Sequence, residues 1–393
     1  MCRTKPYRFF VVVLFCNLLF HESPRLHAGE LWPRHTIDAS LHGADGVKLG
    51  DFDGDGLLDI VTGWEESGVV RLYLNPGADN ARQPWPRVTV GTARSPEDAV
   101  PFDADGDGRL EIISCHEGKQ QQVLVHQLTG PATRSNLLRA ANWKTHPIKR
   151  LNGQQWMFAS SVQFRDGRRG LVIGSKNKRA TLTLLSPTTR QTENISNWPH
   201  RKLRDSGWIM SIQIIDMDND GDEDIVFNDR KSKHRCVAWL EQPDERPHTS
   251  EWPEHTIGAT ESESLFIDAD PDRVLVTTRH KHYLDIRRTA ANRWKSTRIP
   301  GPVDVPFGKA IRRLTPDTIL FTANTHADAA RTKQPGVWLR RTGQGWQPIC
   351  STKECKFDRM ELLDLDGDGD LDMITCEERQ LLGVVWYENP GIR

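Results

Sequence analysis

The stretch Asp51–Gly63 reads DFDGDGLLDIVTG, an acidic loop that runs directly into a strand-like segment. Acidic residues stand at loop positions 1, 3, 5 and 9, and Gly56 stands at position 6. A glycine at the sharp turn lets the preceding side chains converge on one point, while a backbone carbonyl at position 7 and the acid at position 9 complete the cage. Oxygen ligands suit a hard cation such as calcium, and the loop has no Cys or His for a softer metal.

Three further loops repeat this pattern: DADGDGRLE (Asp103–Glu111), DMDNDGDED (Asp216–Asp224) and DLDGDGDLD (Asp364–Asp372). One such loop on its own is equally consistent with a solvated acidic turn, but four copies predict up to four structural calcium ions. The predicted ligands are Asp51, Asp53, Asp55, Leu57 and Asp59; Asp103, Asp105, Asp107, Arg109 and Glu111; Asp216, Asp218, Asp220, Asp222 and Asp224; and Asp364, Asp366, Asp368, Asp370 and Asp372.

The loops belong to a repeat that a tryptophan-led segment marks along the whole chain. The segment begins at Trp32, Trp85, Trp143, Trp198, Trp252, Trp294 and Trp346, at spacings of 53, 58, 55, 54, 42 and 52 residues. Three more strand-like runs follow each segment; in the first unit they are GVKLGDF, LLDIVTG and VVRLYLN. Four short strands per unit of this length are typical of a β-propeller blade.

Three units lack the complete loop. The third has FRDGRRG around Asp166, the fifth has DADPDR from Asp268 with Arg273 in the glycine position, and the sixth has LTPDT around Asp317. We expect no calcium in these units, because the converging carboxylates are missing.

The order of strands also predicts how the ring closes. The chain begins with a tryptophan strand, and its last unit ends after a third strand at Asn389. We therefore expect Trp32–Ile37 to supply the outer strand of the last blade, giving an all-β, seven-bladed propeller without an open edge. The alternative is an open solenoid, which needs capping units at its ends.

The repeat resembles the FG-GAP/VCBS family, the calcium-loop propellers related to the N-terminal domain of integrin α chains. The segments DGDGLLDIVTG, DGDEDIVFND and DGDGDLDMITC carry this resemblance. More narrowly, the chain resembles exported VCBS-repeat proteins of planctomycete-type bacteria. The resemblance implies a fold, calcium, and acidic loops on the face opposite the turns after the second strands. It assigns no activity, although family members include adhesion modules, and some polysaccharide lyases and sugar dehydratases use related propellers.

On that opposite face, the turns after the second strands and the starts of the first strands separate by charge around the ring. An acidic arc from the seventh, first and second units faces a basic arc from the third to fifth units across a central funnel, with tryptophans near the mouth of this funnel. We predict a ligand face made of Asp45, Trp64, Glu65, Glu97, Asp98, Glu117, Trp156, Trp208, Asp229, Arg230, Lys231, Arg279, Asp358 and Glu377.

Three functions fit such a face. The first is a binding or scaffold module for carbohydrate or another acidic, polar ligand. The second is a carbohydrate-active enzyme of polysaccharide lyase or sugar dehydratase type, for which His116 and Lys176 are weak candidates as the base. The third is a structural repeat with no ligand beyond calcium. The sequence has no nucleophile elbow and no glycine-rich phosphate loop.

The N-terminus is typical of an export signal. Arg3, Lys5 and Arg8 precede the apolar run Phe9–Phe20, and small residues follow near position 28. We expect residues 1–28 to be a signal peptide, or alternatively a retained anchor, and residues 29–393 to be a single extracytoplasmic propeller. The net charge of −1 argues against nucleic-acid binding, and no later apolar run is long enough for a membrane span.

Two further expectations concern individual side chains. The tryptophans that lead the repeats are expected to pack between blades, and His35 and His255, which recur beside them, to pack or to form hydrogen bonds. Cys350 and Cys355 lie close enough in the sequence to close a local disulfide.

Overall fold

The computed structural model describes residues 31–188, 194–323, 334–352 and 356–391. The expected signal peptide at residues 1–28 lies outside these ranges, and so does Cys355, so the signal peptide and the Cys350–Cys355 pairing stay predictions. Among the described residues, no helix has the length and apolar character needed to cross a membrane.

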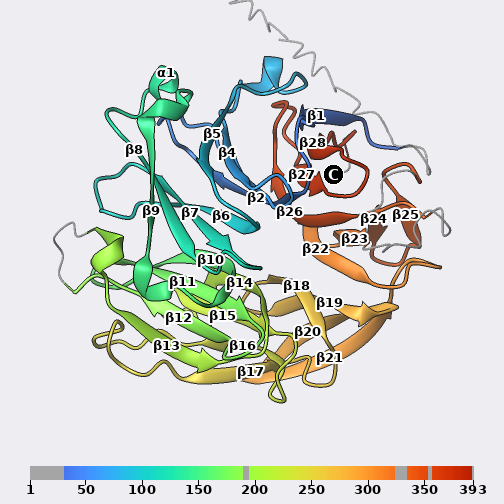
Figure 1. Cartoon of the computed structure of the whole chain (residues 1–393). Coiled ribbons are helices and arrows are strands. Elements are labelled where there is room, and N and C mark those ends of the chain that lie inside the picture. Colours follow the sequence, from blue (N-terminus) through green and yellow to red (C-terminus); the bar gives the residue numbers. More distant parts are fainter. Residues whose placement is uncertain (1–30, 189–193, 324–333, 353–355, 392–393) are drawn as a thin grey trace, which may run out of the picture.

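Seven antiparallel sheets of four strands each surround a central axis (Figure 1). The innermost strands are β2 (Ala44–Gly50), β6 (Pro96–Phe102), β10 (Gln155–Gln163), β14 (Ile209–Ile215), β18 (Ser264–Ala269), β22 (Gly308–Thr315) and β26 (Phe357–Leu363). The second strands are β3 (Asp59–Trp64), β7 (Glu111–His116), β11 (Arg169–Lys176), β15 (Asp224–Asp229), β19 (Arg273–His280), β23 (Thr318–Ala323) and β27 (Asp372–Glu377).

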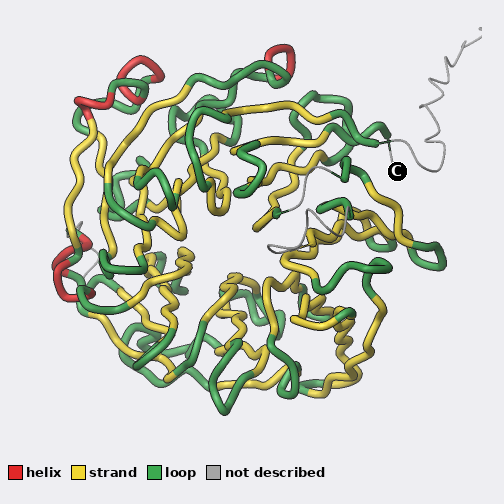
Figure 2. The backbone as a smooth tube through the Cα atoms, turned by 45° about the vertical axis from the view of Figure 1, so that its right-hand side comes forward, coloured by secondary structure: helices red, strands yellow, loops and turns green. Residues whose placement is uncertain are grey.

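The two outer strands complete each blade. The third strands are β4 (Val69–Tyr73), β8 (Val123–Leu128), β12 (Thr181–Leu185), β16 (Cys236–Leu240), β20 (His282–Ala290), β24 (Val337–Arg341) and β28 (Gly383–Tyr387). The outermost are β5 (Arg87–Thr92), β9 (Trp143–Pro147), β13 (His200–Asp205), β17 (Glu254–Gly258), β21 (Arg293–Pro300), β25 (Trp346–Pro348) and β1 (Arg34–Asp38). The only described α-helix, α1 (Arg134–Leu137), is one turn long (Figure 1). The short helical segments, drawn in red, lie at the rim of the ring (Figure 2).

The first and last strands close the ring. β1 pairs with β28 in antiparallel register, with Arg34 opposite Tyr387 and Thr36 opposite Val385. The seventh blade therefore takes three strands from the C-terminal end and one from the N-terminal end, which confirms the predicted closure and the seven-bladed fold. Like the other six, the seventh blade thus has four strands.

Apolar side chains pack between neighbouring blades rather than inside one sheet. Trp85 of the first blade packs with Ile374 and Trp386 of the seventh. Trp143 likewise packs against the first blade. The leading tryptophans thus pack between blades as expected, except that Trp294 and Trp346 are only partly buried.

The two recurring histidines occupy matching places beside this core. The rings of His35 and Trp386 are tilted against each other with centroids 4.5 Å apart, and His35 Nε2 lies 2.8 Å from Glu388 Oε2. His255 stacks on Trp239 at 4.4 Å and reaches Glu241. The expectation that they pack and form hydrogen bonds is confirmed.

Antiparallel order separates the two faces of the ring. Loops between first and second strands leave one face, whereas turns after second strands and entries to first strands lie on the other. In all seven blades, the pairing of the first two strands shifts register near the start of the inner strand. Such a bulge reverses the alternation of side chains locally and decides which of them face the channel mouth.

Candidate functional site

The first acidic loop brings three carboxylates together. One oxygen each from Asp51, Asp53 and Asp59 lies within 4.8 Å of the others. The loop is held by its own backbone, because Asp51 accepts hydrogen bonds from the N–H groups of Gly54 at 2.8 Å and Gly56 at 3.0 Å. Gly56 has φ of 87°, a conformation that favours glycine, so the turn depends on this residue.

The second and third loops repeat the arrangement. Asp103, Asp105 and Glu111 form one group, and Asp216 and Asp218 form another with Asp224. In all four loops the acid at position 9 is nearly inaccessible. Asp59, Asp224 and Asp372 each accept two backbone N–H groups, and Glu111 accepts that of Ala104. Burial raises the pKa of Asp59, Glu111, Asp224 and Asp372 to about 7 each, and neighbouring loop carboxylates add to the rise.

These donors fit a calcium ion. Asp53 Oδ1 is inaccessible to solvent and has no hydrogen-bond partner among the described residues, so it is an unused oxygen inside the loop. The carboxylates at position 5 are turned toward the N–H groups at position 7, as Asp55 is toward Leu57 at 2.8 Å. Arginines balance part of the charge: Arg134 lies 3.1 Å from Asp53, and Arg82 lies 2.6 Å from Asp366.

Arginines close two of the three incomplete loops, whereas Asp317 in the third accepts hydrogen bonds from the hydroxyls of Thr315 and Thr318. Asp166 pairs with Arg168 across a tight turn, and Arg313 contacts both Asp268 and Asp270. A guanidinium thus takes the place next to these carboxylates that a cation would otherwise fill.

On the opposite face, Trp208 is the centre of a cationic group at the channel mouth. It is partly exposed, and the charged ends of Lys176, Arg230 and Lys231 lie 4.7, 4.4 and 4.5 Å from its ring centroid. Arg279 stands nearby over the ring of Phe307 at 4.6 Å. This group, defined by Lys176, Trp208, Arg230, Lys231 and Arg279, is called the basic wall below.

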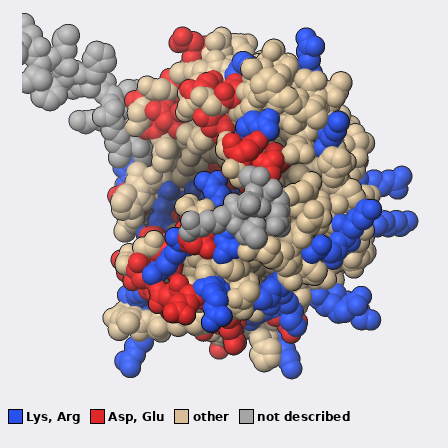
Figure 3. Space-filling view, turned by 90° about the vertical axis from the view of Figure 1, so that its left-hand side faces the viewer, with Lys and Arg blue, Asp and Glu red and all other residues tan. Residues whose placement is uncertain are grey.

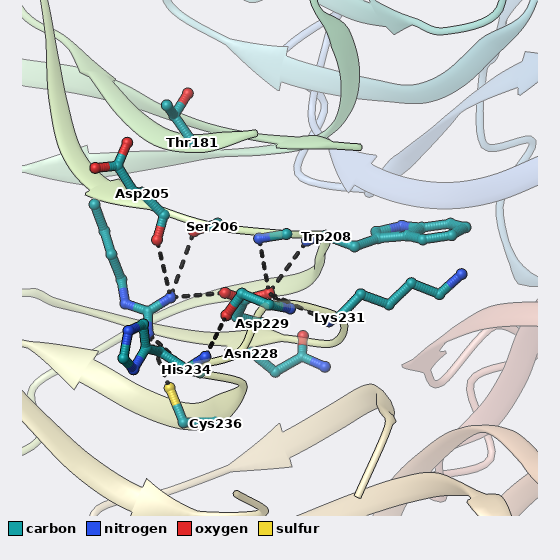
Figure 4. Close-up of polar contacts among 12 residues, drawn as sticks. Thr181, Asp205, Ser206, Trp208, Asn228, Asp229, Lys231, His234 and Cys236 are labelled. Atoms are coloured by element: carbon teal, nitrogen blue, oxygen red, sulfur yellow. Dashed lines mark hydrogen bonds and ion pairs between the residues drawn. The ribbon is translucent and has the colours of Figure 1, made fainter. Parts of the chain in front are cut away.

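Asp229 holds the turns that carry the basic wall. Its Oδ1 accepts the N–H groups of Gly207 at 3.0 Å and Trp208 at 3.1 Å, and its Oδ2 lies 2.9 Å from Arg204 (Figure 4). Because Asp229 is fully buried, it shapes the two turns rather than facing a ligand. Glu377 does the same in the seventh blade, where it accepts the N–H groups of Lys356, Arg379 and Gln380.

Acidic side chains of the seventh, first and second blades meet on the other side of the mouth. Oxygens of Asp45, Glu65 and Glu97 lie within 4.8 Å of one another, as do those of Asp45, Asp358 and Glu378. The acidic and basic arcs join at Lys176, which forms ion pairs with Glu97 at 3.6 Å and with Glu117. Lys309, Lys356 and Lys48, which sequence reasoning missed, also enter this arc; they pair with Asp358, Glu378 and Asp98.

The two candidate catalytic bases are both engaged. His116 is completely buried, with Nδ1 2.8 Å from the Arg94 carbonyl oxygen and Nε2 2.7 Å from Ser114 Oγ. Burial lowers the pKa of His116 to about 4. Lys176 is held as an ion pair, as described above. Neither group is placed to take a proton from a ligand at the mouth.

Two of the three expected mouth tryptophans belong to the core. Trp64 is inaccessible and donates to the hydroxyl of Tyr73 at 2.9 Å. Trp156 is also buried and donates to the Leu151 carbonyl at 2.6 Å. Of the three, only Trp208 offers ring surface to a ligand. Seen from the left-hand side of Figure 1, acidic and basic groups are interspersed, without one extended face of a single sign (Figure 3).

The fold and its loops together define a seven-bladed β-propeller with acidic loops between the first two strands of four blades. Residues 31–114 match the model of the FG-GAP-like repeat, and this stretch includes the first two acidic loops. The expected FG-GAP-type repeat is thus confirmed for this part of the chain. No curated protein matches the sequence.

Solved structures share the fold at low identity. One is described as BBS1N in complex with ARL6DN, soaked with mercury; it is 9% identical with a TM-score of 0.56, over 92% of this chain and 100% of that one. Another, YCF48 bound to D1 peptide, is 12% identical with a TM-score of 0.54 over the same shares. These likenesses concern the fold alone. A propeller with FG-GAP-like repeats suggests a binding or scaffold module.

Proposed function

We propose that the protein is an exported, calcium-braced β-propeller that acts as a binding module, with its ligand site at the channel mouth opposite the acidic loops. The basic and apolar N-terminal segment supports export. The grouped carboxylates of three loops, and the matching sequence of the fourth, support up to four structural calcium ions, which hold the turn between the first two strands of their blades. Because the acidic loops lie on the opposite face of the ring, calcium bound there would leave the ligand face free.

The proposed ligand is an acidic carbohydrate, a sugar that bears a carboxylate or sulfate group. The observation that carries this proposal is the basic wall, in which three cations surround the partly exposed ring of Trp208. An aromatic ring offers a flat surface to a sugar, and Arg230 and Lys231 beside it pair with the anionic group, while Lys176 is already paired with Glu97 and Glu117. Glu263 already holds Arg230 at 3.1 Å, so this guanidinium is positioned before a ligand arrives.

The test is a binding screen of purified protein against acidic and neutral glycans with calcium present. We expect binding to acidic glycans only, and a loss of at least about tenfold in affinity for Trp208→Ala, since stacking and cation contacts are lost together. Trp294→Ala is the matched control, because Trp294 also lies beneath an arginine, Arg288 at 4.8 Å, but on the outermost strand β21.

Binding that is equal in the wild type and Trp208→Ala, or no binding across the panel, would contradict the proposed ligand. The same samples are read for unsaturated sugar products, which a lyase releases. Release of such products would favour a lyase over a binding module. The two candidate bases do not support a lyase, because His116 is buried and Lys176 is paired.

A further inference from the structure

The acidic arc holds two carboxylates, Asp45 and Glu65, whose charge the nearby lysines offset only in part. Lys176, Lys309 and Lys356 form ion pairs with Glu97, Asp358 and Glu378, respectively. Among the described residues, no lysine or arginine lies within ion-pair distance of Asp45 or Glu65. Asp45 is nevertheless only 7% exposed, so its charge has little access to water.

Unused oxygen atoms point to a missing partner. Asp358 is 2% exposed, and its Oδ1 is inaccessible and has no hydrogen-bond partner in the described part of the chain, while its Oδ2 lies 3.0 Å from Lys309. No N–H group of the described residues donates to the Asp45 carboxylate, whose neighbours are the carboxyl groups of Asp358 and Glu97 and the ammonium group of Lys309. The contact between Asp45 and Asp358 is a hydrogen bond only while one of the two carboxyl groups keeps a proton. A buried acceptor without a donor is unfavourable, so the arrangement favours an occupant that supplies positive charge.

We propose that Asp45, with Glu65 and Glu97 as the other ligands and Asp358 beside it, binds one hard divalent cation at the channel mouth, at a site separate from the four acidic loops. Asp45 belongs to both three-carboxylate groups, and within each group the oxygens lie within 4.8 Å of one another. A small ion can contact three oxygens at this spacing. The donors are all carboxylate oxygens, which favours calcium or manganese over a thiophilic metal.

The electrostatics agree with this assignment. Burial, with Asp358 and Glu97 adding to it, raises the pKa of Asp45 well above its ordinary value. Burial and the carboxylates of Glu97 and Glu66 raise the pKa of Glu65 to about 7. A divalent ion would remove this repulsion and would lie beside the basic wall, in reach of the same ligand face.

The experiment counts bound Ca²⁺, and separately Mn²⁺, per chain by equilibrium dialysis and elemental analysis. Asp45→Asn and Glu65→Gln are compared with the wild type, and Glu117→Gln is the control, because Glu117 lies in the same arc but outside both groups. We expect each of the first two variants to lose one equivalent of at least one of these ions and the control to lose none. Equal counts for both ions in the wild type, Asp45→Asn and Glu65→Gln would overturn the site.

Two features keep the result decisive. Glu65 is only partly buried, so Glu65→Gln remains a test if Asp45→Asn folds poorly. In chelator, Asp45→Asn is expected to melt no lower than the wild type, because the substitution removes repulsion between carboxylates. The difference in bound ions per chain between the wild type and each variant does not depend on whether the acidic loops bind calcium. Should the loops bind no calcium, the wild type would hold a single ion that Asp45→Asn still loses.

Discussion

Lys48 Nζ lies 2.5 Å from Asp98 Oδ2, and both side chains are buried at the channel. The same ammonium group donates to the carbonyl oxygen of Ala159 at 2.6 Å, while Asp98 Oδ2 accepts the Ala159 N–H at 3.0 Å. One ion pair therefore joins the inner strands of three successive blades, β2, β6 and β10. Burial lowers the pKa of Lys48, and the Asp98 carboxylate opposes this effect.

Lys48→Met is expected to lower the free energy of unfolding by about 3–5 kcal/mol, because Asp98 would be left as a buried charge without a partner. Denaturant unfolding in calcium measures the change. In Lys48→Met/Asp98→Asn the charge is gone and an acceptor for the Ala159 N–H remains, so most of the loss should be recovered. Equal losses in the single and double variants would show that the ion pair is not the cause.

Gly383→Ala is expected to weaken the closure of the ring. Gly383 begins β28 with φ of 69°, and an added Cβ would lie 2.1 Å from the Asp38 carbonyl oxygen of β1. Gly343→Ala is the control, since its φ is 79° but no atom lies within 4 Å of the new Cβ. Both share a backbone penalty of about 1 kcal/mol. Only Gly383→Ala should lower the melting temperature further, and equal shifts would mean that the contact with β1 is not limiting.

The number of blades and the closure were predictable because they depend on local signals that recur with the repeat. The glycine of each acidic loop and the tryptophan of each outer strand stand at fixed places in the unit. The channel mouth was less predictable. A register shift between Trp156 and Phe158, and its equivalents in the other blades, changes which side chains face the mouth, so Trp64 and Trp156 are in the core.

The missed lysines have a related cause. Lys48 stands among apolar residues in the inner-strand segment GVKLG, and Lys309 stands in FGKAIRRL, ahead of Arg312 and Arg313. Their role becomes visible only when Asp98 and Asp358 are brought beside them from other blades. A lone lysine in an inner-strand pattern was the available signal, and it indicates a buried acidic partner without saying which one.

Acid is expected to destabilise the protein through two buried histidines of the second blade. His116 and His126 both contact Ser114 Oγ through Nε2, at 2.7 and 2.8 Å. Burial lowers the pKa of His116 to about 4 and that of His126 to about 3. In the unfolded chain both titrate near about 6.5. Below that pH the unfolded state binds more protons, so this stability is complete above about pH 6.5 and is lost as the pH falls toward 4.

Melting temperatures between neutral pH and about pH 4 measure this effect. Through these two histidines the unfolded chain binds at most roughly two more protons than the folded chain, which sets the steepest decline expected. His126→Gln should flatten the decline because one of the two groups no longer titrates. His146→Gln, at an exposed position on β9, is the control and should leave the slope unchanged. Acidic residues contribute equally to all three proteins, so an unchanged slope in His126→Gln would contradict the assignment.

Calcium removal is expected to lower the melting temperature by several degrees or more. An ion that binds only the folded state stabilises it by about 2.7 kcal/mol per site at a hundredfold excess over its Kd, and up to four loops would contribute. Asp53→Ala and Asp366→Ala should each remove one bound ion, because each deletes the position-3 carboxylate of its loop. Asp166→Ala, in a loop closed by Arg168, is the control and should remove none. If the melting curve in chelator coincides with that in calcium, the ions do not brace the blades, and the arginines at Asp53 and Asp366 would then be the groups that balance the loop charge.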